Sequence, residues 1–131
     1  MFKRVEHTEI MVSDMDRTLD FYTSIIGFKV LWRRKPDRPP FDEIAFLDLN
    51  GTLVEVFAKK DAVPYPSRQW RIGCHRLALE VDDMDETAQY LSEKGVTISQ
   101  KPAIVGTSNM AECLDPDGIP VQLVQRDVKA D

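Results

Sequence analysis

The chain has 131 residues, which suits one domain with a core of useful size, and its 43% hydrophobic and 30% charged residues are ordinary for a globular protein. Its net charge is −5 with basic residues scattered along the chain, which argues against nucleic acid as a partner. No apolar run approaches the roughly 20 residues of a membrane helix, and the N-terminus lacks a secretory signal, so we expect a cytoplasmic protein with no membrane partner.

The sequence contains an internal repeat. Residues 12–18 (VSDMDRT) recur as residues 81–87 (VDDMDET), with five of the seven positions identical. Two copies are too few for a solenoid and instead suit a pseudo-twofold domain. We therefore predict one domain over residues 1–131. Its repeats are expected at about residues 4–58 and 72–127, with a proline-containing linker over residues 59–71.

The first copy is predicted to open with a strand over residues 7–12. A helix follows, which Ser13 or Asp14 can cap and Gly27 can end. Apolar residues recur three or four positions apart along this helix and form one stripe: Met15, Leu19, Tyr22 and Ile26. Three further strands are expected at residues 28–33, 43–49 and 52–58. The last two are joined by Asn50-Gly51, a strong hairpin signal.

The second copy is predicted to follow the same order. A strand over residues 76–81 precedes a helix that Asp83 caps and Gly95 ends, and Met84, Ala88 and Leu91 form its apolar stripe. Strands at residues 97–101, 109–114 and 119–126 follow. The chain is therefore predicted to be an α+β protein built from two β-α-β-β-β units.

Alternation along the strands predicts which side chains share a face. Ile10 and Val12 suit a helix-covered face, so His7 and Glu9 should point to the opposite face. The same argument sends further side chains to that opposite face: Glu55, Phe57, Arg76 and Gln122. By the repeat, His7 corresponds to Arg76 and Glu55 to Gln122, so two symmetry-related pairs of polar residues should lie on a face that either binds a ligand or is filled by side chains.

The residues that carry these features resemble the vicinal oxygen chelate superfamily, which includes glyoxalase I, bleomycin-resistance proteins and extradiol dioxygenases. The segments that resemble it are residues 7–22, Gly27-Phe28, and residues 114–118 (LDPDG) followed by Gln122. The resemblance implies a glyoxalase-like fold in which the two repeats form a curved eight-stranded mixed sheet. It also implies a homodimer and a small-molecule ligand or substrate.

In the metalloenzymes of that superfamily, the first and fourth strands of each copy each supply one metal ligand. His7 and Glu55 match two of these positions, whereas Arg76 stands where a histidine is usual and Gln122 where a glutamate is usual. Arginine stays protonated and cannot ligate a metal, and glutamine can ligate through its oxygen but cannot act as a base. His75 lies one residue from the expected place and would need a β-bulge to face the site.

Two functions follow as hypotheses. In the first, a divalent metal (Ni, Zn, Co, Mn or Mg) is held by His7, Glu55 and Gln122, and Glu55 shuttles protons in a lyase or isomerase acting on a small oxygen-rich molecule. In the second, the protein is a metal-free, drug-sequestering binder of the bleomycin-resistance type. There Arg76 pairs with Glu55, Glu80 or Glu9 or holds an anionic ligand. The expected substrate-binding set is Arg76, Glu9, Phe57 and Trp32.

Overall fold

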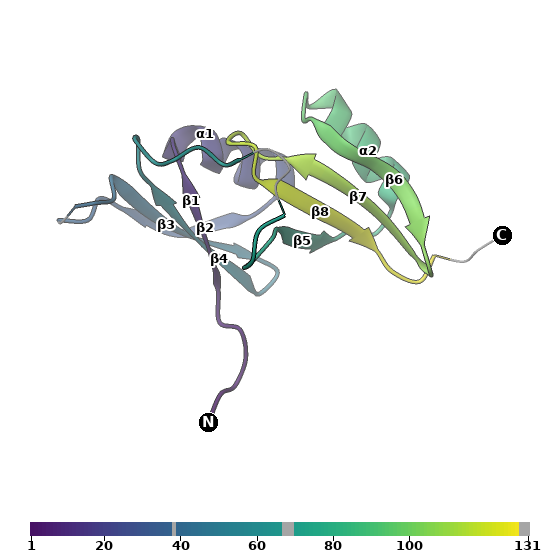
Figure 1. Ribbon diagram of the computed structural model, residues 1–131, viewed down its shortest axis with the longest axis horizontal. Helices are drawn as coiled ribbons and strands as arrows, with labels where there is room; N and C mark the ends of the chain where they lie inside the picture. The colour runs from purple at the N-terminus through teal and green to yellow at the C-terminus, as the bar shows by residue number, and fades with distance from the viewer. Residues whose placement is uncertain (38, 67–69, 129–131) are drawn as a thin grey trace. The chain divides into compact units, whose positions relative to one another are not determined.

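The computed structural model describes residues 1–37, 39–66 and 70–128 (Figure 1). The chain divides into two compact units, Met1–Pro64 and Tyr65–Asp131, and each unit holds one copy of the repeat. This confirms the α+β class and the two β-α-β-β-β repeats, and the boundary falls inside the predicted linker. That the two units make up a single domain stays a prediction.

The first unit contains one four-stranded mixed sheet. Its strands are β1 (Thr8–Val12), β2 (Lys29–Arg34), β3 (Glu43–Leu49) and β4 (Thr52–Ala58). Their order in the sheet is β1-β4-β3-β2, with β1 parallel to β4 and the other pairs antiparallel. Asn50 and Gly51 both have positive φ, 50° and 91°, as a two-residue type I′ hairpin requires.

The first helix differs from the regular helix that the sequence predicts. Asp14 caps α1 (Met15–Leu19) by accepting a hydrogen bond from the backbone N–H of Arg17 at 2.9 Å. The chain then continues as a π-helix, η1 (Asp20–Ile26). The Thr23 hydroxyl donates to the Leu19 carbonyl at 2.6 Å, the acceptor that α-helical bonding would assign to the Thr23 backbone N–H. Gly27 ends the helix in the left-handed region, as predicted.

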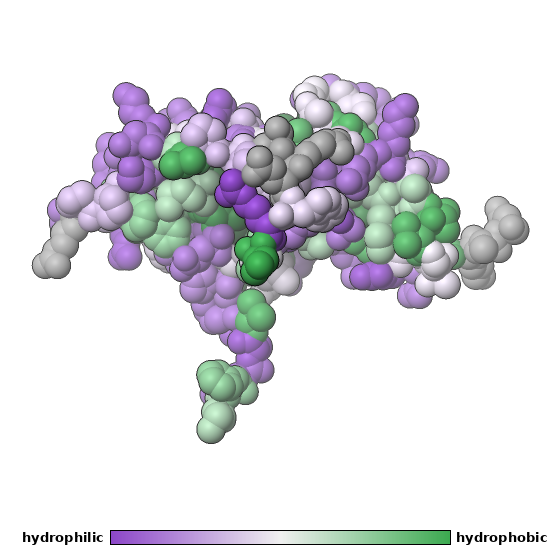
Figure 2. Space-filling view, viewed as in Figure 1, coloured by the Kyte–Doolittle hydropathy of each residue, from purple (hydrophilic) through white to green (hydrophobic). Residues whose placement is uncertain are grey.

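The helical segment covers one face of this sheet, and the core lies between them. Ile10, Val12, Val54 and Val56 are all buried on that face, which confirms the predicted alternation. The helical side of the core is formed by Met15, Leu19, Phe21 and Tyr22. The N-terminal segment extends away from the sheet, and its exposed apolar residues appear green at its tip in Figure 2. On the opposite face of the sheet Glu9 is exposed, and Phe46, Glu55 and Phe57 are half-buried.

The second unit repeats the arrangement with β5 (Leu77–Glu80), α2 (Met84–Glu93), β6 (Ile98–Val105), β7 (Ser108–Leu114) and β8 (Pro120–Gln125). The sheet order is β5-β8-β7-β6, and β5 runs parallel to β8. Strand β6 continues past the predicted end at residue 101. It can hold Pro102 because it is an edge strand and its pairing with β7 shifts register between Gln100 and Ala103.

A helix cap, a hydrogen-bonded turn and a hydrophobic core hold the second unit together. Asp83 caps α2, as predicted, and the buried carboxylate of Asp115 accepts hydrogen bonds from the backbone N–H groups of Asp117 and Ile119, both at 2.9 Å. The core between α2 and the sheet includes Met84, Leu91, Ala111, Cys113, Val121 and Leu123.

Among the described residues, no helix is long and apolar enough to cross a membrane.

Candidate functional site

A row of side chains crosses the open face of the first unit's sheet. Glu9 of β1 lies opposite Glu55 of β4, Glu55 lies opposite Phe46 of β3, and Phe46 lies opposite Trp32 of β2. Because residues opposite each other on paired strands point to the same face, the four strands each contribute one side chain to this row. The row brings together three of the predicted site residues and adds Phe46.

His7 lies just before β1 at the acidic end of the row. Its Nε2 atom is 3.3 Å from a carboxylate oxygen of Glu9 and 3.6 Å from one of Glu55, and its Nδ1 atom contacts the carboxylate of Glu6. One ligand atom from each of His7, Glu9 and Glu55 lies within 4.8 Å of the others. The ring of His7 also meets Phe46 edge to face, with centroids 5.4 Å apart. Two predicted metal ligands, His7 and Glu55, are therefore adjacent.

The electrostatics of this cluster favour a positive charge. The hydrogen bonds of His7 to Glu6 and then to Glu9 raise its pKa above the ordinary 6.5, because the carboxylates stabilise the imidazolium. Like charges that face each other across two paired strands repel. Glu9 and Glu55 are such a pair, so a proton on His7 or a bound cation would relieve their repulsion.

The other end of the row is aromatic. Trp32 stacks on Phe46 with ring planes 5° apart and centroids at 5.5 Å, and the guanidinium of Arg34 lies 4.7 Å from the centre of the Trp32 ring. Trp32 keeps 37% of its surface exposed, so it can contact a ligand. Phe57, two residues beyond Glu55 on the same face of β4, is half-buried, and its ring packs against Phe41 at 4.7 Å.

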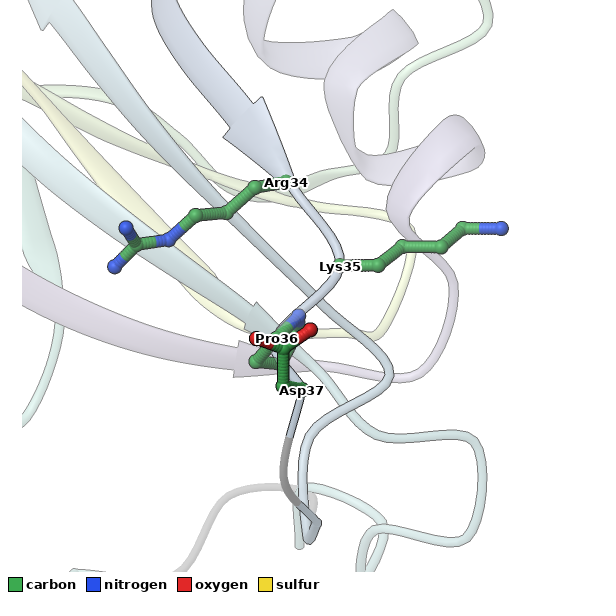
Figure 3. Close-up of a pocket in the computed structure, with 4 residues that line it drawn as sticks. All are labelled: Arg34, Lys35, Pro36 and Asp37. Atoms are coloured by element: carbon green, nitrogen blue, oxygen red, sulfur yellow. The ribbon is translucent and has the colours of Figure 1, made fainter.

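A surface depression of about 360 Å³ lies at the end of β2 and is lined by Arg34, Lys35, Pro36 and Asp37 (Figure 3). Figure 3 shows the side chains of Arg34 and Lys35 pointing to opposite sides of the chain. The two cations therefore do not converge on one ligand, and we place the candidate site at the row instead.

In the second unit, Arg76 forms an ion pair that the sequence analysis missed. Its guanidinium contacts the carboxylate of Glu112, whose other oxygen accepts a hydrogen bond from the Ser99 hydroxyl at 2.7 Å. Glu112 is buried, with 7% of its surface exposed. The partner of Arg76 is thus a residue of its own repeat and none of the three glutamates considered from the sequence. Glu112 lies opposite Gln122 in the antiparallel pairing of β7 with β8. That pairing could have identified Glu112 as a neighbour of the predicted site.

The two other predicted metal ligands, Gln122 and His75, differ in burial and in the residues that they contact. The half-buried Gln122 donates its side-chain N–H to the sulfur of Met110 at 3.6 Å. His75 is exposed, precedes β5, and lies with its ring 4.9 Å from that of Trp70. The pairing of β5 with β8 is regular from Leu77 to Glu80 and includes no bulge that would re-aim His75. Metal ligation by Gln122 or His75 stays a prediction.

Comparison with known proteins adds to this geometry. The family model described as Glyoxalase/Bleomycin resistance protein/Dioxygenase superfamily matches residues 4–123. The probable lactoylglutathione lyase of Synechocystis is 30% identical over 132 residues, covering 95% of this chain and 97% of that protein. The glyoxalase family protein of Enterococcus faecalis has a TM-score of 0.84 at 26% identity, covering 94% and 98%. TnmS3, an antibiotic-binding protein of Streptomyces, has a TM-score of 0.72 at 26% identity, covering 95% and 97%.

Proposed function

This chain belongs to the glyoxalase/bleomycin resistance protein/dioxygenase superfamily, and from that premise we propose that it is a divalent-metal-dependent lyase or isomerase acting on a small oxygen-rich molecule. The observation that supports this proposal is the cluster of His7 and Glu55 on the open face of the first unit, where Nε2 and the carboxylate lie 3.6 Å apart. The lyase name of the Synechocystis relative points to the same reaction class.

The donor set of the cluster fits a divalent metal. It offers one imidazole nitrogen and carboxylate oxygens, which are the ligands that Ni, Co, Mn, Zn and Mg accept in proteins. A divalent ion held by His7 and Glu55 would supply Lewis acidity to two adjacent oxygens of the substrate. At the two positions of the second repeat that correspond to His7 and Glu55, only the neutral oxygen of Gln122 could ligate, because Arg76 cannot ligate a metal and is paired with Glu112.

Glu55 carries the proton transfer in this proposal. Its side chain is only 17% exposed and lies between His7 and the aromatic residues of the row. It accepts a proton from one substrate carbon and returns it to the neighbouring carbon, a role that the amide of Gln122 cannot perform. Phe46 lies opposite Glu55 in the ladder and Trp32 stacks on it, so this carboxylate has an aromatic surface beside it that a substrate could contact.

The test is a screen of α-hydroxycarbonyl compounds and thiol hemithioacetals against the chain reconstituted with each of the five metals. For any substrate found, Glu55→Gln should lower turnover by roughly 10²–10⁴-fold, because a general base contributes on that order. Asp20→Asn, an exposed acidic residue on the helical side of the same unit, is the matched control and should leave turnover unchanged. Undiminished turnover by Glu55→Gln would contradict the proposal.

A second function, metal-free binding of a small molecule, is favoured by the stack of Trp32 on Phe46 beside Arg34 and by the likeness to an antibiotic-binding protein. Such a binder takes a planar aromatic ligand on the exposed surface of Trp32. Titration with a panel of planar antibiotics should then quench tryptophan emission, and Trp32→Ala should weaken binding by at least roughly tenfold, since base- or ring-stacking contributes about 1–3 kcal/mol. Equal binding by Trp32→Ala would count against it.

A further inference from the structure

The position of Glu9 makes the cluster self-contained within the first repeat. Glu9 and Glu55 face each other in the parallel ladder of β1 and β4, so their carboxylates rise side by side from one face of two hydrogen-bonded strands. His7 lies two residues before Glu9, and its Nε2 atom reaches both carboxylates, at 3.3 Å and 3.6 Å. Ligands bound to one ion at about 2.0–2.2 Å are themselves about 3–3.5 Å apart, so the two distances from Nε2 are close to those of a ligand set, and all three ligand atoms lie within 4.8 Å of one another.

The charges of the cluster also match a divalent ion. With a neutral imidazole, Glu9 and Glu55 together contribute −2, which balances a charge of +2. Without a cation these two carboxylates repel each other across the ladder. The second repeat supplies no compensating ligand charge, because Arg76 is neutralised by Glu112 and Gln122 is uncharged.

Glu6 provides an independent reason to regard His7 as a ligand. Its carboxylate contacts Nδ1 of His7, the ring nitrogen that faces away from Glu9 and Glu55. A carboxylate at this position would keep the proton on Nδ1 when an ion displaces the proton from Nε2, and histidine ligands in metal sites usually have such a partner.

We propose that the metal site is built from the first repeat alone, with His7, Glu9 and Glu55 as its three protein ligands and Glu6 as the residue that positions His7. This assignment rests on the proposed function for the presence of a metal. It differs from the ligand set that the family resemblance implies, which is divided between the two repeats. Glu9, expected from the sequence to contact substrate, binds the ion instead.

The experiment is calorimetric titration of the whole chain, freed of metal by dialysis against chelator, with Mn²⁺, Co²⁺, Ni²⁺ and Zn²⁺. Glu9→Gln and Glu55→Gln keep the shape of each side chain and remove its charge, and each should weaken affinity by roughly 100-fold or more. Glu6→Gln should weaken it by roughly 10–100-fold, as loss of a residue that orients a ligand does. Gln122→Ala and the control Asp20→Asn should stay within about twofold of the unmodified chain.

A second readout separates ligand loss from misfolding. Each metal-free variant should melt cooperatively, and saturating metal should raise the thermal midpoint of the unmodified chain but not that of Glu9→Gln. Loss of affinity in Gln122→Ala together with normal affinity in Glu9→Gln would overturn the three-ligand site and leave the proposed metal-dependent function standing. Absence of binding by the unmodified chain for all four ions would overturn both.

Discussion

Removing the charge of Glu112 is expected to destabilise the second unit strongly. Glu112 is buried, and it contacts the guanidinium of Arg76, whose side chain is 21% exposed. Breaking a fully buried ion pair costs about 3–5 kcal/mol, because it leaves one charge uncompensated. Arg76 retains some access to water, so we expect Glu112→Gln to lower the free energy of unfolding by about 2–3 kcal/mol. For a chain of this length that corresponds to a fall in thermal midpoint of roughly 6–12 °C.

The assay is urea unfolding followed by circular dichroism, arranged as a double-mutant cycle. Arg76→Met combined with Glu112→Gln leaves no unpaired charge, so the double variant should be less destabilised than the sum of the two single variants, by about 1 kcal/mol or more. Glu80→Gln alters an exposed carboxylate of the same unit and should change the free energy of unfolding by less than about 0.5 kcal/mol. Strict additivity in the cycle, or a Glu112→Gln variant as stable as the parent, would refute the reasoning.

Three further outcomes are expected. Arg33 hydrogen-bonds to Glu43 and holds its pKa below the ordinary 4.5, so this pair stabilises the fold above about pH 4.5 and is lost as the pH falls through the lowered value. The parent and Glu43→Gln should differ in unfolding free energy by at most about 1 kcal/mol at neutral pH, because the pair is partly exposed to solvent. This difference should vanish in acid, and a difference that persists at pH 3 would be inconsistent with the reasoning. Burial raises the pKa of the Cys113 thiol to about 11, so a thiol reagent at pH 8 should label the exposed Cys74 first and Cys113 only after denaturation; simultaneous labelling in the native state would contradict this. Light scattering at micromolar concentration should give twice the 15.0 kDa mass of the chain, since we expect a homodimer, and a monomeric mass would exclude it.

The elements of the fold could be predicted because their signals are local. The two aspartate caps and the alternating apolar residues can each be recognised within a few neighbouring positions, and the repeated segment shows that both copies have the same elements. The strands at residues 43–49 and 52–58 accordingly have the predicted bounds. Apart from shifts of one residue at strand ends, two departures concern backbone hydrogen bonds. The Thr23 hydroxyl competes for a backbone acceptor in the first helix, and Pro102 is tolerated only because β6 is an edge strand with shifted register. Neither outcome follows from periodicity alone.

The candidate site depends on a different kind of information, the register between strands. Alternation places His7, Glu9 and Glu55 on one face, but their adjacency requires that Glu9 pair with Glu55 in a parallel ladder, and no turn links two parallel strands to set that pairing. An antiparallel hairpin is different, because its turn determines which residues face each other.

The turn from Asp115 to Gly118 joins β7 to β8, so counting outward from it places Glu112 opposite Gln122 and beside the position equivalent to a metal ligand. A buried carboxylate there has to meet a positive charge, and Arg76 is the cation that the repeat places on the same face. The ion pair of the second repeat was therefore within reach of the sequence, whereas the His7–Glu9–Glu55 cluster of the first repeat required the folded sheet. In the second repeat the buried carboxylate is neutralised by an arginine of the same unit. In the first repeat the two facing glutamates have no such arginine among the contacts of the described residues, which is why we propose a bound cation there.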